Sequence, residues 1–257
     1  MDAIGAVEAP ARAVVVMQLP RRATVALLGG FRLMNGAEAV VVPPRCQRLL
    51  AFLALRETPV RRSLAAGTLW PDTSEDRAHA SLRSVLAWLR RAGKGVVDAD
   101  SVDIGLADEV AVDLRRARQA AEDLLPPSTQ AIDPSATRSV ISLLSRELLP
   151  GWYDDWTLLE AENWRQLRLH ALEALAARLV AAHHFGDAAG AALAAVGADP
   201  LRESAHVALV RVHLAEGNRS EALRAFERFR RLLHAELGLE PTQHLVGLVA
   251  GLHPVAS

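Results

Sequence analysis

The stretch SEDRAHASLRSVLAWLRRAG, residues 74–93, carries the clearest helical pattern in the first half of the chain. At 100° per residue, its apolar side chains gather in one stripe, which predicts a helix with a single buried face. Glu75 and Asp76 stand in the first turn, where the helix dipole favours acids, and Gly93 is a termination signal. The apolar stripe consists of Ala78, Leu82, Val85, Leu86 and Leu89.

The opposite arc of this helix alternates small residues with arginines. Small residues let a helix approach the floor of a DNA groove, and arginines donate in pairs to guanine edges and phosphates. The alternative is an ordinary solvated face, but such a face usually interleaves glutamates four residues from its arginines. No acid follows Asp76 in the helix, which favours a DNA-reading surface. The arc contains Arg77, Ala80, Arg83, Ser84, Ala87, Arg90 and Arg91.

The segments around this helix predict a winged helix. Three short β-like pieces (24–30, 31–35 and 39–43) and two helices (45–55 and 62–70) precede it, and a hairpin region (96–113) follows. We expect the small sheet to close one side of the three-helix core, which leaves one face of the last helix free. Arginines at the starts of the two earlier helices are candidate phosphate clamps. They are Arg45, Arg48, Arg61 and Arg62.

The charge distribution divides the chain into two halves. Residues 21–94 hold 13 basic and 5 acidic residues, about +8, whereas residues 95–257 hold 15 and 23, about −8. A basic half beside an acidic half indicates two domains with different partners, and nucleic acid is the usual partner of a basic one. We therefore predict a loose tail over 1–22, a DNA-binding domain over 23–112 and a helical domain over 113–257.

The second half is rich in alanine and leucine and contains an internal repeat. Asp113 is expected to cap a helix over 114–125, and a proline-rich loop (126–137) precedes the remaining helices. Alignment of Gly186 with Gly217 gives two helix–turn–helix units, each followed by a proline-containing turn. This pattern is typical of tetratricopeptide-like repeats, in which helical hairpins stack and alanines permit close contact between helices. Those alanines are Ala174, Ala177, Ala188, Ala191, Ala205, Ala208 and Ala222.

The stretch LLPGWYDDW, residues 148–156, concentrates aromatic side chains in a chain that has only eleven. We expect Asp154 or Asp155 to cap a helix that begins near Trp156. Trp152, Tyr153 and Trp156 then close the end of the helical stack or wedge it against the neighbouring domain. A ligand-binding box is the alternative. A catalytic carboxylate pair is disfavoured because adjacent aspartates at a helix start diverge.

Taken together, these motifs resemble a known family. FRLMNG, PPRCQRLLAFLAL, LWPD and RAHASLRSVLAWLRR are similar to the OmpR-type winged-helix domain of the small Streptomyces antibiotic regulatory proteins, the SARP activators. LLPGWYDDWTLLEAENWRQLRLHALEALA, ADPLRESAH and LAEGNRSEALRAFERFRRLL are similar to their bacterial transcriptional activation domain. The resemblance covers about residues 24–252. The predicted fold class is mainly α: an N-terminal winged helix-turn-helix (α+β) followed by an all-α tetratricopeptide-like domain.

The resemblance implies a cytoplasmic activator of bacterial secondary metabolism. Such proteins bind direct repeats in double-stranded DNA side by side near a promoter, which suggests a homodimer on DNA, and contact RNA polymerase holoenzyme. Arg77, Arg83, Ser84, Arg90 and Arg91 would lie in the major groove, with the hairpin near 96–112 as the wing.

Two other hypotheses stay open. The wing region is acidic, which repels phosphate and favours a protein-interaction scaffold with weak or no DNA affinity. An enzyme is disfavoured, since LGGFRLMNG lacks the dinucleotide fingerprint and the histidines lack metal spacing, so no cofactor and no metal are expected. The chain has a single cysteine, Cys46, which excludes an internal disulfide and fits a reducing cytoplasm. The apolar run near residue 15 is too short for a membrane span.

Overall fold

The computed structural model describes residues 23–92, 95–126 and 134–252, so the expected tail over 1–22 lies outside the described residues. The chain divides into two compact units. Of the described residues, the first unit holds residues 23–24 and those within 33–111. The second holds Val25–Arg32 and the described residues from 112 to 252. A short early segment, Val25–Arg32, therefore belongs with the helical half, which the sequence pattern did not indicate.

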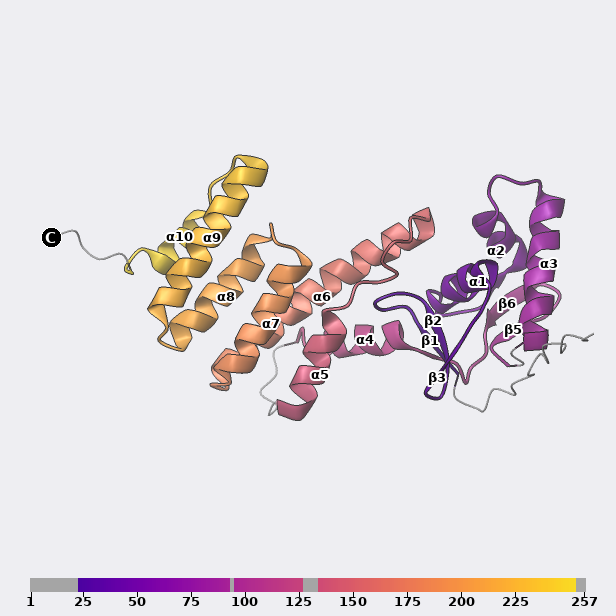
Figure 1. The fold of residues 1–257 in the computed structure, drawn as a ribbon, viewed down its shortest axis with the longest axis horizontal. Helices are drawn as coiled ribbons and strands as arrows, with labels where there is room; N and C mark the ends of the chain where they lie inside the picture. Colours follow the sequence, from indigo (N-terminus) through magenta and orange to yellow (C-terminus); the bar gives the residue numbers. More distant parts are fainter. Residues whose placement is uncertain (1–22, 93–94, 127–133, 253–257) are drawn as a thin grey trace, which may run out of the picture. The chain divides into compact units, whose positions relative to one another are not determined.

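The first unit contains the helices and the hairpin of a winged helix (Figure 1). A four-stranded sheet has the order β3-β2-β1-β7, and a three-stranded sheet has the order β4-β6-β5. The elements are β1 (Ala23–Ala26), β2 (Arg32–Asn35), β3 (Glu38–Val40), α1 (Pro44–Ala54), β4 (Val60–Arg61), α2 (Arg62–Leu69), α3 (Glu75–Ala92), β5 (Val97–Ala99), β6 (Asp103–Leu106) and β7 (Ala111–Val112).

Helix α3 has the two faces that its periodicity predicts. Ala78, Leu82, Val85, Leu86 and Leu89 are all buried, because α3 packs on α1 and α2 with this stripe inward. The seven residues of the opposite arc are all exposed, and we call them the outward face of α3: residues 77, 80, 83, 84, 87, 90 and 91.

Among the described residues of the second unit, the regular elements are helices, apart from its share of β1 and β2 and from Val112 of β7. The predicted fold class is confirmed. Its helices are α4 (Asp113–Glu122), α5 (Pro134–Leu144), α6 (Asp155–Ala181), α7 (Phe185–Ala198), α8 (Glu203–Ala215), α9 (Arg219–Leu237) and α10 (Gln243–Val249). Figure 1 shows α6, α7, α8 and α9 stacked as successive antiparallel neighbours. Their shared core includes Leu175, Leu179, Val210, Phe226 and Phe229.

The internal repeat is present, but its alignment on Gly186 and Gly217 was wrong by three residues. In the α6–α7 turn His184 N–H donates to Leu179 O, and in the α8–α9 turn Asn218 N–H donates to His213 O, 34 positions further on. The residue equivalent to Gly217 is thus His183, and both are left-handed, with φ of 83° and 59°. The first turn has a histidine, His183, at the position where the second turn has Gly217. An alignment on glycines therefore does not pair these two residues.

Substitutions at His183 and Gly217 test whether the two turns are equivalent. His183 is exposed and adopts a backbone conformation that costs a β-carbon-bearing residue about 1 kcal/mol. His183→Gly is therefore expected to leave stability unchanged or raise it by up to about 1 kcal/mol, while Gly217→Ala lowers it by about 1 kcal/mol. Urea unfolding followed by circular dichroism measures both. If Gly217→Ala is neutral and His183→Gly is strongly destabilising, the equivalence of the two turns is contradicted.

Asp113 does not cap a helix as expected. It is the first residue of α4, and the N-cap position is held by Val112. The Asp113 carboxylate instead accepts the backbone N–H groups of Leu27 and Leu28, at 2.8 and 3.1 Å. The early segment is held further by Gly29 N–H, which donates to Glu147 O, and by Leu149 N–H, which donates to Leu27 O.

The aromatic segment after α5 divides into covered and exposed rings. Trp152 and Trp156 are half-buried and meet edge to face with ring centroids 6.3 Å apart, and Trp152 also packs on Phe31 at 6.3 Å. Tyr153 is 81% exposed, so its ring takes no part in this packing. Its expected role against the neighbouring domain stays a prediction.

None of the described helices is long and apolar enough to cross a lipid bilayer.

Candidate nucleic-acid interface

The outward face of α3 presents its cations without acidic partners. Arg77, Arg83, Arg90 and Arg91 are exposed, and within the described part of the chain none of them forms an ion pair. The acids of α3, Glu75 and Asp76, stay in its first turn. A polyanion approaching this face would therefore meet positive charge that no carboxylate of α3 beyond its first turn offsets.

The side chains of the outward face differ in how far they are held. Ser84 Oγ donates to Ala80 O at 3.0 Å, and Arg91 Nε donates to Ala87 O at 3.2 Å, so both lie along their own helix. Arg90 and Arg91 occupy the last turn, where a cation also stabilises the helix dipole. Arg77 and Arg83 have neither of these ties, which makes them the freest donors on the face.

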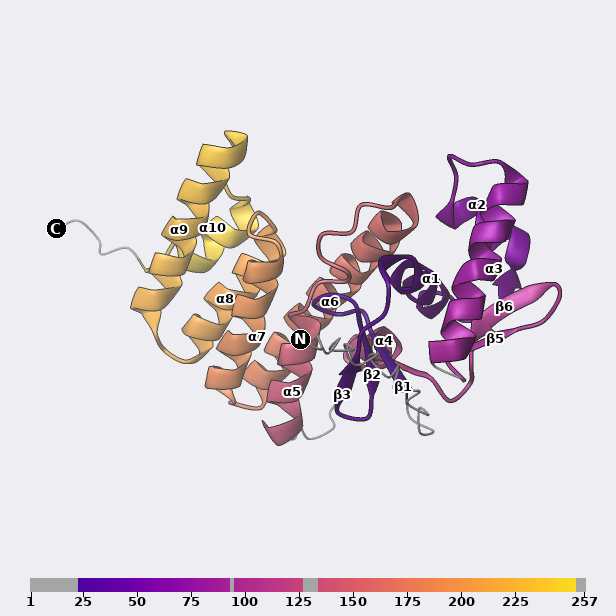
Figure 2. The same cartoon turned by 45° about the vertical axis from the view of Figure 1, so that its right-hand side comes forward.

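The hairpin of β5 and β6, which we call the wing (residues 97–106), lies beside α3 (Figure 2). Its turn is closed by Asp100, whose Oδ1 accepts the N–H groups of Val102 and Asp103, both at 2.7 Å. These two amides, that of Asp103 most, hold the pKa of the Asp100 carboxyl below its usual value. The Asp100 carboxylate thus belongs to the wing's own backbone.

Arg61 and Arg62 contact the wing. Arg61 lies in strand β4, paired with Asp103, and its Nε is 3.6 Å from the Asp103 carboxylate. Arg62 Nη1 donates to Asp100 O at 2.7 Å, and its backbone N–H donates to Val102 O at 2.9 Å. The sequence pattern predicts that both arginines bind phosphate from the start of a helix, and it does not predict their contacts with the wing. Their contact with DNA stays a prediction.

The remaining candidates lie near the start of α1. Pro44 occupies the first turn of this helix, where its missing N–H costs nothing. Arg45 beside it is exposed and Arg48 is half-buried. The orientation of these side chains toward a phosphate stays a prediction, as it does for the outward face of α3.

The wing has fewer unengaged carboxylates than its sequence suggests. Asp108 and Glu109 lie after β6, outside the hairpin. Asp100 is engaged by backbone amides and Asp103 by Arg61, which leaves Asp98 as the exposed acid of the wing without a described partner. The repulsion of phosphate by the wing is therefore weaker than five carboxylates would produce.

Other chemistry-bearing side chains have structural surroundings. Burial raises the pKa of the Cys46 thiol to about 11, so it is not a poised nucleophile. His206 is buried, stacks on Phe229 with ring centroids 4.1 Å apart and has Nε2 2.9 Å from Pro200 O; burial lowers its pKa. Over the described residues, no group of three or more metal-binding side chains comes together.

Comparison with known proteins points to a bacterial transcriptional regulator with a winged helix followed by a stack of helical hairpins. Residues 136–252 match the family model of the bacterial transcriptional activator domain. This match and the two regulatory relatives described next support the resemblance to the SARP transcriptional activators that the sequence motifs indicated. The match to a transcriptional activator domain favours a regulator over the enzyme hypothesis.

Among curated proteins, the chain is similar to the regulatory protein AfsR of Streptomyces griseus, with 29% identity over 242 residues. It is also similar to AfsR of Streptomyces coelicolor, with 29% identity over 227 residues. These alignments cover 86% and 84% of this chain but only 24% and 22% of the two relatives. The chain thus spans about a quarter of the length of the relatives it matches.

Among solved structures, the fold is similar to Mycobacterium tuberculosis EmbR, which was determined in complex with a low-affinity phosphopeptide. The TM-score is 0.66 at 21% identity, over 91% of this chain and 66% of EmbR. At this identity the likeness establishes the fold.

Proposed function

We propose that this chain is a sequence-specific DNA-binding transcriptional activator. The observation that carries the proposal is the outward face of α3, where exposed arginines and small residues stand without acidic partners. Helix α3 would enter the major groove, and Arg77 and Arg83 would donate to base edges or phosphates. The wing, held by Arg61 and Arg62, would lie against the neighbouring backbone or minor groove.

The division of labour follows the domain order. Residues 23–112 would bind DNA, and residues 113–257 would act as the activation domain. The resemblance to the SARP activators supports direct repeats as the operator, two copies side by side on them, and RNA polymerase holoenzyme as the partner in the bacterial cytoplasm. Footprinting on the promoter beside the gene, with purified polymerase added, tests each of these points.

The first test is a gel shift on that promoter. Arg83→Ala is expected to weaken specific binding about 10- to 100-fold, the usual cost of losing a bidentate base contact. If Arg77 contacts phosphate instead, Arg77→Ala weakens binding to all sequences and reduces the slope of log affinity against log salt by about 1. Arg224→Ala is the control, because Arg224 is exposed on α9 and pairs with Glu221.

The result that contradicts the proposal is equally definite. If Arg77→Ala and Arg83→Ala both bind like the parent chain, α3 does not read DNA. If the parent chain binds no promoter fragment at 50 mM salt, where phosphate contacts are strongest, DNA binding itself is rejected.

A second candidate function is a protein-interaction scaffold with weak or no DNA affinity. It is favoured by the exposed acids of the wing region, Asp98, Asp108 and Glu109. Pull-down of RNA polymerase in nuclease-treated solution, together with blank gel shifts, would support this candidate over the first.

A further inference from the structure

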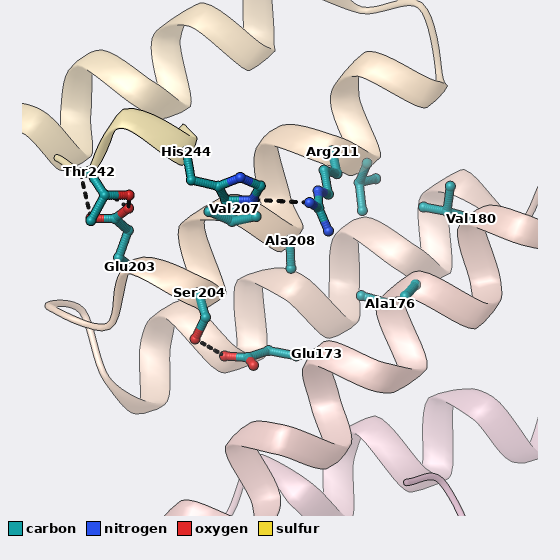
Figure 3. A pocket seen from close by; sticks show the side chains of 12 residues that line it. Glu173, Ala176, Val180, Glu203, Ser204, Val207, Ala208, Arg211, Thr242 and His244 are labelled. Carbon is teal, nitrogen blue, oxygen red and sulfur yellow. Dashed lines mark hydrogen bonds between the residues drawn. The ribbon is translucent and has the colours of Figure 1, made fainter. Parts of the chain in front are cut away.

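A cavity of about 570 Å³ lies in the helical unit between α6, α8 and the start of α10 (Figure 3). Its size falls within the range of small-molecule sites. Helices α6 and α8 are the first helices of the two repeats. The sequence pattern does not predict a cavity here.

The cavity exists because its walls are made of short side chains. Ala176 and Val180 of α6 and Val207 and Ala208 of α8 lie around it (Figure 3). Ala177 of α6 also lines it. Ala177 and Ala208 were expected to permit close helix contact, but Ala177 is exposed and Ala208 half-buried, and both line this space. Ala188 and Ala222, by contrast, are fully buried and do serve close packing.

The acids at the rim already have partners. Glu173 Oε1 accepts Arg202 Nε at 2.8 Å and Ser204 Oγ at 2.7 Å. Glu203 accepts the backbone N–H of Thr242 at 3.0 Å and also the Thr242 hydroxyl. Both carboxylates therefore accept hydrogen bonds from within the protein, and that of Glu173 also forms an ion pair with Arg202.

The cation at the rim has no such compensation. Arg211 Nη2 donates to His244 Nε2 at 3.0 Å, a contact that requires an unprotonated His244 nitrogen and leaves the guanidinium charge unopposed. No carboxylate forms an ion pair with Arg211 among the residues that the structure describes. The cavity therefore combines an apolar floor with one uncompensated positive charge at its edge.

We propose that this cavity binds a small amphipathic carboxylate, with its apolar body over Ala177, Val207 and Ala208 and its carboxylate on Arg211. Arg211 offers the planar paired donors that match a carboxylate. A cationic head is less favoured, because Glu173 is paired with Arg202 and both oxygens of Glu203 accept hydrogen bonds from Thr242. The proposal concerns a ligand of the helical unit and stands apart from the proposed DNA binding.

Isothermal titration of the full chain, without DNA, tests it with octanoate as the probe. Octanoate is expected to bind one site, while octanamide and octylamine, which match its length, bind at least tenfold more weakly or not at all. Arg211→Met is expected to weaken octanoate binding at least tenfold. Ala208→Leu, which fills the floor, is expected to abolish it.

Matched controls keep the test decisive if a variant is disturbed. Arg224→Met removes an exposed arginine elsewhere, Ala215→Leu enlarges an exposed alanine at the end of α8, and both should bind octanoate like the parent. Circular dichroism confirms that Arg211→Met and Ala208→Leu keep their helix content. The proposal is overturned if octanoate does not bind, if octylamine binds as well, or if folded Arg211→Met and Ala208→Leu bind normally. Binding of an aliphatic peptide without binding of octanoate likewise overturns it.

Discussion

Trp164→Ala is expected to lower the free energy of unfolding of the helical unit by about 3–5 kcal/mol, the usual cost of truncating a buried tryptophan. The Trp164 side chain is only 1% exposed and is among the largest fully buried groups of the chain. Its Nε1 donates to Arg146 O at 2.9 Å, so truncation removes both packing and the partner of a carbonyl just after α5. Urea unfolding followed by circular dichroism measures the change.

Two further variants separate these contributions. Trp164→Phe keeps most of the apolar volume and loses the hydrogen bond, so a smaller loss of about 1–2 kcal/mol is expected. Tyr153→Ala, in the same aromatic-rich part of the sequence, should change stability by less than about 0.5 kcal/mol, because the Tyr153 ring is exposed. Equal losses for Trp164→Ala and Tyr153→Ala would refute the assignment of the core aromatic.

Asp113→Ala is expected to cost about 2–5 kcal/mol. The carboxylate accepts the N–H groups of Leu27 and Leu28, two residues with no solvent exposure, and each buried donor left without an acceptor costs about 1–3 kcal/mol. Beyond the lost stability, the segment 25–32 should become more mobile. Amide hydrogen exchange at Leu27 and Leu28 is therefore expected to accelerate more than exchange in α8.

Asp123→Ala is the matched control at the other end of α4. Asp123 is exposed and accepts only from Gln119 Nε2 at 2.9 Å among the described contacts, so its loss should stay within about 0.5 kcal/mol. Asp113→Asn keeps one acceptor oxygen and should fall between the two. If Asp113→Ala behaves like Asp123→Ala, the carboxylate does not hold the early segment.

Much of the candidate interface could be predicted from local pattern. The outward face of α3 was predicted residue by residue, because a helix repeats every 3.6 residues and a core admits only its apolar stripe. The wing's contacts could not be predicted in the same way. Arg61 and Arg62 read as helix-start arginines, and only strand pairing between β4 and β6 brings them to Asp103 and Asp100.

The sequence by itself determined the order of elements and the buried and exposed faces of α3, since these depend on residues a few positions apart. Tertiary structure alone decided two other features. It assigned the segment 25–32 to the helical unit through Asp113, some 85 residues away. It also opened the cavity beside Arg211. The physical reason is shared: a hydrogen-bond partner or a gap between helices depends on which distant side chains meet, and local periodicity does not encode that meeting.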